Sequence, residues 1–128
     1  MKDFANWFSK KAHLDRLVHK PPYVSEGDIW WASIGENVGS EVNGKSDLFS
    51  RPVIVLKKLA HGFYFVIPTS TKDKHGSWYV PYKHQGVSNV ACLHQVRAID
   101  YRRILSKLGT LDDTDFARVK NGFNDLYR

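Results

Sequence analysis

No segment of this chain constrains its fold more than residues 51–56, which read Arg-Pro-Val-Ile-Val-Leu. The β-branched residues favour a buried strand, and the strand starts directly after a charged residue and a proline. Proline fixes its own φ angle and shifts the preceding residue toward extended backbone. We therefore expect Arg51 at the mouth of a buried strand, with its guanidinium free. A guanidinium suits phosphate because it is planar, always charged and bidentate.

Length and composition narrow the class of protein. The 128 residues fit one domain, and a chain of that length buries roughly two thirds of its unfolded surface. Cys92 is the only cysteine, so no internal disulfide can form, and a reducing, cytoplasmic compartment is expected. The N-terminus has no apolar run typical of a secretory signal, and no segment approaches the length of a membrane span.

The net charge of +6 is spread unevenly. Residues 23–44 hold four acidic side chains and no Lys or Arg, whereas residues 45–83 hold seven Lys or Arg against two Asp. Such asymmetry predicts a positive face and a polyanionic partner such as nucleic acid. General solubility is the alternative explanation.

The first residues read as a helix appended to the core. Asp3 can cap a helix over residues 3–19, and Pro21 ends it. Its apolar residues approximate one face: Phe4, Trp7, Phe8, Leu14, Leu17 and Val18. We therefore divide the chain into a helical extension, 1–22, and a main domain, 23–128.

From Glu26 onward the pattern is that of short strands. Runs rich in Val, Ile, Trp, Tyr and Phe predict strands at 28–34, 52–58, 62–68, 77–82 and 89–94. A short link makes a hairpin of the second and third. Residues 35–50 form a long glycine-containing loop, which is usually functional, and residues 71–77 form a basic loop.

The end of the chain is predicted to be helical. Residues 101–108 suggest a short helix before a tight turn at Gly109. Asp112 then starts a helix whose apolar positions should pack on the sheet: Phe116, Val119, Phe123 and Leu126. Five short strands with a packing helix predict a mostly β (α+β) fold, built on a small barrel.

Metal and nucleotide chemistry find no support in the motifs. The six histidines form no His-Glu-x-x-His pattern, and no cluster of carboxylates suggests a magnesium site. No glycine loop has the spacing for phosphate binding followed by a helix. We expect neither a metal nor a cofactor.

Polar side chains at predicted strand ends are the remaining candidates. Pro68 ends an apolar strand and should release Thr69 and Ser70 at its tip, where hydroxyls can bind a phosphate or ribose. Taken singly, these are also ordinary turn residues. His94 can equally be a packed polar residue, and Arg97 can simply pair with a nearby Asp.

Five motifs occur in an order that resembles the PemK/MazF toxin family. They are Gly27-Asp28-Ile29-Trp30, Gly39-Ser40-Glu41, Arg51-Pro52-Val53-Ile54-Val55, Ile67-Pro68-Thr69-Ser70 and Gln95-Val96-Arg97-Ala98-Ile99-Asp100. The resemblance runs from about Gly27 to Leu126. It implies an SH3-like barrel that dimerises, the toxin of a type II toxin–antitoxin pair, and metal-free cleavage of single-stranded RNA, usually mRNA. It also implies an antitoxin, expected to be acidic, whose tail occupies the RNA groove.

By position, the resemblance makes Arg51 and Thr69 catalytic and makes Ser70 and Gln95 line the site. We add His94 as a tentative acid or base, because imidazole titrates near neutral pH and relatives can carry an acidic residue there. Further candidates for binding RNA are Glu41, Thr71, Lys72, Lys74 and Trp78, with Tyr79 and Tyr82 as other stacking surfaces. The stretch from Lys45 to Ser50 is extra relative to the family.

The predicted reaction is attack of the ribose 2′-hydroxyl on the adjacent phosphate, with Arg51 stabilising the charge. Three alternatives stay open. A toxin resembling the CcdB group would poison gyrase without cutting RNA. A non-catalytic barrel would bind nucleic acid in a salt-sensitive way. A plain interaction module would have basic loops that are only solvated.

Overall fold

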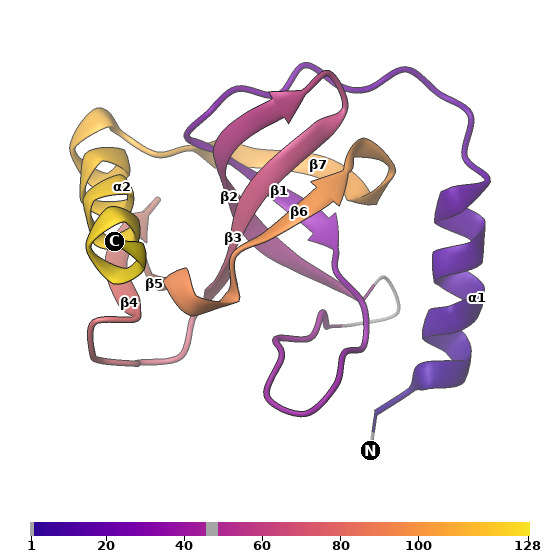
Figure 1. The fold of residues 1–128 in the computed structure, drawn as a ribbon, viewed down its shortest axis with the longest axis horizontal. Helices are drawn as coiled ribbons and strands as arrows, with labels where there is room; N and C mark the ends of the chain where they lie inside the picture. The colour runs from indigo at the N-terminus through magenta and orange to yellow at the C-terminus, as the bar shows by residue number, and fades with distance from the viewer. Residues whose placement is uncertain (1, 46–48) are drawn as a thin grey trace.

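A computed structural model of the chain describes residues 2–45 and 49–128 (Figure 1). Seven strands are found within these residues, with one helix at each end of the chain. The helices are α1 (Phe4–Asp15) and α2 (Asp113–Tyr127), the 3-10 turns are η1 (Leu93–Gln95) and η2 (Tyr101–Arg103), and the strands are β1 (Asp28–Ser33), β2 (Ser50–Ala60), β3 (Phe63–Ser70), β4 (Tyr79–His84), β5 (Val87–Cys92), β6 (Arg97–Asp100) and β7 (Ile104–Thr110). The predicted mostly β fold with a helix at either end is confirmed.

The strands form one antiparallel sheet in the order β4-β5-β3-β2-β1-β7, and β6 also pairs with β3. β3 connects the two parts of the sheet, because it pairs with β2 along most of its length and then with β5 at Thr69 and Ser70. The two ends of this path approach each other where the His84 ring packs on the backbone of Gly109. No pairing joins β4 to β7 there, so the sheet curls as a barrel does but is not closed.

Two hydrophobic clusters fill the fold. One lies among β1, β2, β3 and β6, around the fully buried Tyr64 and Val53. The other lies between the sheet and α2, which covers β4 and η1 (Figure 1). Val119 is fully buried there, and the other predicted apolar positions of α2 pack around it: Phe116, Phe123 and Leu126. The Asp112 carboxylate caps the helix by accepting from the Asp115 amide at 2.7 Å. The predicted helix is thus confirmed.

The predicted short helix over 101–108 is wrong. Only Tyr101–Arg103 form a helical turn, and the chain then extends as β7, which pairs with β1. Gly109 lies within this strand and does not form a tight turn. The edge of β1 offers unpaired backbone groups, and pairing with them overrides the weak local preference. β6 was not predicted either, because its four residues are too few to show the alternation of apolar and polar residues that indicates a strand.

Helix α1 starts as predicted but ends earlier, at Asp15. Asp3 caps it by accepting from the Asn6 amide at 3.2 Å. Of the predicted apolar face, Trp7 and Leu14 are buried, with Leu17 packed nearby. The remaining members are exposed: Phe4, Phe8 and Val18. The buried stripe is therefore narrower than the predicted face, because only Trp7 and Leu14 of the helix pack with Phe49, and the helix ends before Val18.

The boundary between 1–22 and 23–128 stays a prediction, and residues 46–48 of the extra stretch Lys45–Ser50 lie outside the described residues. Among the helices that are described, none is both long and apolar enough to cross a membrane.

Candidate active site

Arg51 lies near the start of β2, where this strand is flanked by β1 and β3. It pairs with Ala32 of β1, and its half-buried side chain reaches across to β3. The guanidinium donates from Nε to the Asn43 carbonyl at 2.8 Å and from Nη1 to the Thr69 carbonyl at 3.0 Å. Burial lowers the pKa of Arg51 from its ordinary value, and the nearby Cys92 acts in the opposite direction. An arginine remains charged despite such a shift, so a fixed positive charge lies at this site.

Thr69 and Ser70 do not form a free strand tip, which corrects the prediction. β3 continues through both residues, and they pair with Ala91 and Val90 of β5. The Thr69 side chain is only 1% exposed, and its hydroxyl donates to the Pro52 carbonyl at 2.9 Å. Pro68 does not end the strand. It lies opposite Val53 where β3 pairs with β2, and the strand then continues by pairing with β5.

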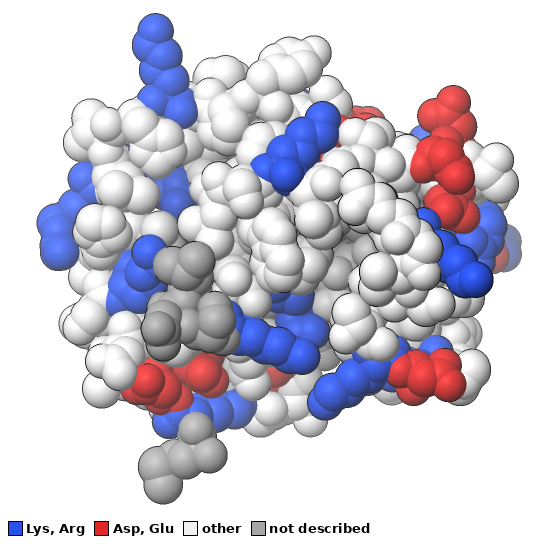
Figure 2. Space-filling model, turned by 180° about the vertical axis from the view of Figure 1, so that it is seen from behind, with Lys and Arg blue, Asp and Glu red and all other residues white. Residues whose placement is uncertain are grey.

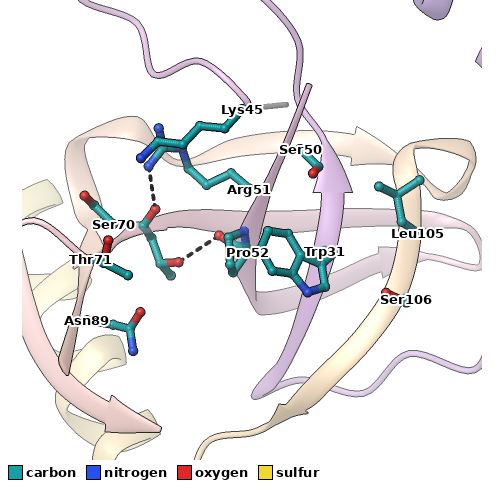
Figure 3. Close-up of a pocket in the computed structure, with 11 residues that line it drawn as sticks. Trp31, Lys45, Ser50, Arg51, Pro52, Ser70, Thr71, Asn89, Leu105 and Ser106 are labelled. Carbon is teal, nitrogen blue, oxygen red and sulfur yellow. Dashed lines mark hydrogen bonds between the residues drawn. The ribbon is translucent and has the colours of Figure 1, made fainter. Parts of the chain in front are cut away.

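A pocket of about 520 Å³ opens beside these residues (Figure 3). It brings together four of the predicted site residues: Arg51, Thr69, Ser70 and Thr71. Its other lining residues are Trp31, Lys45, Ser50, Pro52, Asn89, Leu105 and Ser106. The pocket thus combines cationic groups, several hydroxyls, an amide and an indole, a set that can bind a phosphate and a base together.

Sequence reasoning missed several residues of this pocket. Trp31 belongs to the same tryptophan pair as Trp30, whose place in a strand was predicted, and the alternation of faces could have identified it. The sequence predicts a short helix over 101–108, and so it does not identify Leu105 and Ser106 as residues of this pocket. Asn43 does not line the pocket, but its main-chain carbonyl holds Arg51, and the sequence carries no signal for such a contact.

Glu41, His94 and Gln95 lie apart from Arg51, in a second cavity of about 550 Å³ between η1 and the loop that follows β1. Gln95 ties η1 to that loop, because its Oε1 accepts from the Val42 amide at 3.0 Å and its Nε2 donates to the Ser40 carbonyl at 3.1 Å. Glu41 accepts from the Val38 amide at 2.7 Å. These contacts show the two side chains shaping the loop.

His94 is enclosed by aromatic rings. Its imidazole stacks on Trp78, with ring centroids 4.8 Å apart, and meets the edge of Tyr79 at 5.2 Å. Burial, and then the charge of Lys74, lower the pKa of His94, while a main-chain contact with Trp78 opposes this shift. A neutral imidazole is therefore favoured near pH 7, and it can accept a proton more readily than donate one.

The basic loop forms a third cavity next to the first. Thr71, Lys72 and Lys74 line it together with Tyr79 and Asn89. The Lys74 ammonium lies 5.6 Å from the centre of the Tyr79 ring. Trp78 is 52% exposed, so one face is open for stacking.

Tyr82 cannot serve as a stacking surface, which corrects that candidate. Its side chain is buried in the cluster beneath α2. Burial raises the pKa of Tyr82 to about 12, against a smaller lowering by a hydrogen bond with Thr69. The strand faces alternate, so Tyr82 points inward.

On the face seen in Figure 2, the positive side chains do not gather into a single patch. Figure 2 shows Lys and Arg side chains spread over one face of the molecule, with acidic side chains toward its margins. Among the residues described, no group of three or more His, Cys, Asp or Glu side chains is placed to hold a metal ion.

Comparison with solved structures identifies the class of protein that this fold and pocket define. MazF from Deinococcus radiodurans is 26% identical and superposes with a TM-score of 0.67, covering 82% of this chain and 97% of that one. A MazE–MazF structure from the same organism is 23% identical with a TM-score of 0.62, covering 82% and 96%. The Mycobacterium tuberculosis toxin MazF-mt6 is 14% identical with a TM-score of 0.60, covering 78% and 95%. The last two show the fold alone.

The family model for the PemK-like, MazF-like toxins of type II toxin–antitoxin systems matches residues 25–127. The chain therefore belongs to this toxin family, whose members are generally endoribonucleases. The resemblance predicted from the five motifs is confirmed. No curated protein matches the sequence. Helix α1 lies outside the matched residues.

Proposed function

We propose that this chain is a toxin that cuts single-stranded RNA, chiefly mRNA, at short sequences and without a metal ion. One observation carries the proposal. The guanidinium of Arg51 is held by two main-chain carbonyls at a pocket that also presents the hydroxyls of Ser70 and Thr71. A charge fixed before the substrate arrives needs little reorganisation during reaction, which is the main source of electrostatic catalysis.

The proposed reaction uses the ribose 2′-hydroxyl as an internal nucleophile on the neighbouring phosphorus. A bond forms between the 2′-oxygen and phosphorus while the bond from phosphorus to the 5′-oxygen breaks, which leaves a 2′,3′-cyclic phosphate and a free 5′-hydroxyl. The proton of the 2′-hydroxyl passes to a general base, and a general acid gives one to the departing 5′-oxygen. Because the RNA supplies its own nucleophile, the main tasks of the protein are to orient the phosphate and to stabilise the negative charge that develops on it. Arg51 supplies the charge, and the hydroxyls of Ser70 and Thr71 with the Asn89 amide hold the phosphate oxygens.

Thr69 has a positioning role in this proposal. Its carbonyl accepts from Arg51 and its hydroxyl donates to Pro52, so it links β2 to β3 beside the guanidinium. Direct contact between its hydroxyl and the phosphate stays a prediction.

Proton transfer by His94 is likewise a prediction. The imidazole is enclosed by Trp78 and Tyr79 and lines a cavity separate from that of Arg51. Its lowered pKa favours the neutral form, which is the form required of a general base. We assign to Gln95 and Glu41 the shaping of the loop that borders the RNA, and to Lys72, Lys74 and Trp78 contact with flanking nucleotides.

The proposal includes partners. Since structures of MazF with MazE share this fold, we propose that an antitoxin binds the chain and that its acidic tail covers the Arg51 pocket. We also propose a homodimer and a cytoplasmic location. Sedimentation of the purified protein tests the proposed homodimer, and a monomer at micromolar concentration would contradict it.

The alternatives make different predictions for Arg51. A gyrase-binding toxin of the CcdB type has no need of an arginine held beside hydroxyls in an open pocket, which argues against it. A non-catalytic nucleic-acid-binding barrel retains salt-sensitive binding but leaves RNA intact.

The test is incubation of a long single-stranded RNA with the purified protein in excess EDTA, beside Arg51→Ala. Arg118→Ala is the matched control, because Arg118 lies on the surface of α2 and pairs with Asp115. We expect discrete fragments ending in 2′,3′-cyclic phosphate from the wild type and the control, and none from Arg51→Ala. Cleavage by a folded Arg51→Ala protein at the normal rate would refute the assignment of Arg51. Cleavage that requires a divalent ion would refute metal independence.

A further inference from the structure

The loop that leads into Arg51 is held from outside by helix α1. The Trp7 side chain is 6% exposed and packs against Gly35 and Phe49, with the Trp7 and Phe49 ring centroids 5.4 Å apart. Its contact with Gly35 is so close that a Cβ atom there would lie 2.1 Å from the indole Cε2. Trp7 therefore touches both ends of the segment that runs from the end of β1 to the start of β2.

Phe49 has a backbone conformation that needs such support. Its φ angle is 51°, in the left-handed region that bulky residues rarely adopt. Its carbonyl accepts from the amides of Ile34 at 3.0 Å and Gly35 at 3.1 Å. A Cβ atom on Gly44 would lie 1.7 Å from this oxygen. Three passes of the chain thus meet at Phe49, two residues before Arg51.

The same contacts lead from Phe49 to the guanidinium. Lys45 and Ser50 exchange main-chain hydrogen bonds of 2.8 and 2.9 Å, which joins the loop to the first residue of β2. The Asn43 carbonyl then accepts from Arg51 Nε at 2.8 Å. Where this carbonyl lies, and so where the guanidinium points, depends on how the loop is anchored.

A second anchor comes from the residue before the helix. Lys2 donates from Nζ to the carbonyls of Asn37 and Gly39. The Asn37 side-chain amide donates in turn to the carbonyls of Ile34 at 3.1 Å and Val42 at 2.7 Å, and its main-chain amide donates to the Asn43 side chain. Contacts from the start of the chain therefore reach the residue that holds Arg51.

We propose that α1 is a positioning element for the cleavage reaction, in which Trp7 holds Gly35 and Phe49 so that the Asn43 carbonyl fixes the Arg51 guanidinium. This inference rests on the function proposed above. It gives a role to α1, which lies outside the residues matched by the family model. Trp7 touches no reacting atom in this proposal, so it is a positioning residue.

The first measurement does not depend on activity. The Nε–H resonance of Arg51, assigned by its disappearance in Arg51→Lys, is followed by NMR through its exchange with solvent. We expect slow exchange in the wild type, because this proton is donated to Asn43. Exchange should become fast in Trp7→Ala, approaching that of the exposed Arg128, and Trp7→Phe should restore part of the protection. Unchanged protection in a folded Trp7→Ala protein would overturn the proposal, whether or not the chain cuts RNA.

The second measurement is single-turnover cleavage of an RNA that the wild type cuts. Trp7→Ala should lower the cleavage rate roughly tenfold to a hundredfold, since small misplacements of a catalytic group have effects of that order. Affinity for the RNA should change little. Trp7→Phe should recover much of the rate.

Two controls separate positioning from general destabilisation. Phe8→Ala removes an aromatic side chain that is 74% exposed on the same helix, and it should leave the rate unchanged. Val119→Ala opens the buried cluster beneath α2, which is a different cluster from that of Trp7 and Phe49, and should lower the melting temperature without lowering the rate under conditions where the protein is folded. If Val119→Ala lowers the rate as much as Trp7→Ala does, Trp7 acts only through stability. If the wild type cuts no RNA while Trp7 still controls the exchange of Arg51 Nε–H, the cleavage function fails and the positioning role stands.

Discussion

Arg51 on β2 donates a hydrogen bond from Nη1 to the main-chain carbonyl of Thr69 on β3, at 3.0 Å. Thr69 returns a hydrogen bond from its hydroxyl to the Pro52 carbonyl at 2.9 Å. The proposed catalytic arginine and the neighbouring threonine are thus joined across two strands in both directions. Because Arg51 uses the carbonyl of Thr69, its orientation does not require the threonine side chain itself.

This relationship predicts different effects for two substitutions at Thr69. Thr69→Val keeps the shape but leaves the partly buried Pro52 carbonyl without its donor, which should lower the free energy of unfolding by about 1–3 kcal/mol. Thr69→Ser keeps the hydroxyl and should cost less. Thermal denaturation measures both. If only positioning matters, Thr69→Val should lower the cleavage rate by no more than roughly a hundredfold, whereas a much larger loss rescued by Ser would show that the hydroxyl contacts the phosphate.

The indole of Trp31 is expected to stack on a base of the bound RNA. Trp31 lines the pocket that contains Arg51, while Trp78 stacks on His94 beside another cavity. Loss of one stacked base costs about 1–3 kcal/mol, so Trp31→Ala should weaken binding to a short single-stranded RNA by roughly one to two orders of magnitude. Fluorescence anisotropy of a labelled RNA measures this binding. Both proteins should also carry Arg51→Ala, so that the RNA is not cut during the measurement. A larger effect from Trp78→Ala would move the main stacking surface to the second cavity.

His94 should make the fold less stable in mild acid. Burial and Lys74 depress its folded-state pKa below the ordinary value of 6.5. As the pH falls below about 6.5, the unfolded chain binds the proton first, so the free energy of unfolding decreases until the folded-state pKa is reached. Urea denaturation from pH 7.5 to 5 measures this slope, which should be smaller in His94→Gln. The control His13→Gln alters an exposed histidine of α1, and an equal change of slope in both variants would contradict the assignment.

Asp28, from the first family motif, is expected to be structural. Its carboxylate is buried and accepts from the Ser25 amide at 2.8 Å, the Trp30 indole at 3.2 Å and the Thr110 hydroxyl at 3.1 Å. Asp28→Asn replaces an acceptor with a donor, which should lower the free energy of unfolding by about 2–4 kcal/mol.

Lys107 provides the comparison for Asp28. Its ammonium lies 3.4 Å from the Asp28 carboxylate but is about half exposed. Lys107→Met should therefore cost no more than about 1 kcal/mol. Equal losses of stability for the two variants would mean that the ion pair, and not the buried hydrogen bonds, is what Asp28 contributes.

Much of the site could be predicted because its members follow local rules. A β-branched run after Arg-Pro indicated the strand that carries Arg51, and Asp112 with apolar residues at helical spacing indicated α2. The order of five short motifs identified the family, which the match over residues 25–127 confirms. These features depend on residues close together in the chain.

Other features depend on contacts between distant segments. β7 forms because β1 offers an unpaired edge, and this pairing brings Leu105 and Ser106 to the Arg51 pocket. Thr69 is buried because β3 leaves β2 and pairs with β5 at that point. His94 and Gln95 line a different cavity from Arg51, because η1 places them beside the loop after β1.

The sequence by itself therefore determined the family, the strand that carries Arg51 and the helix that covers the second cluster, because propensity, capping and periodicity act over a few residues. Only the tertiary structure decided which candidates share a pocket, which face of α1 is buried and which carbonyls hold the guanidinium. Those outcomes come from strand pairing and packing between residues far apart in the chain, whose energies no local pattern contains.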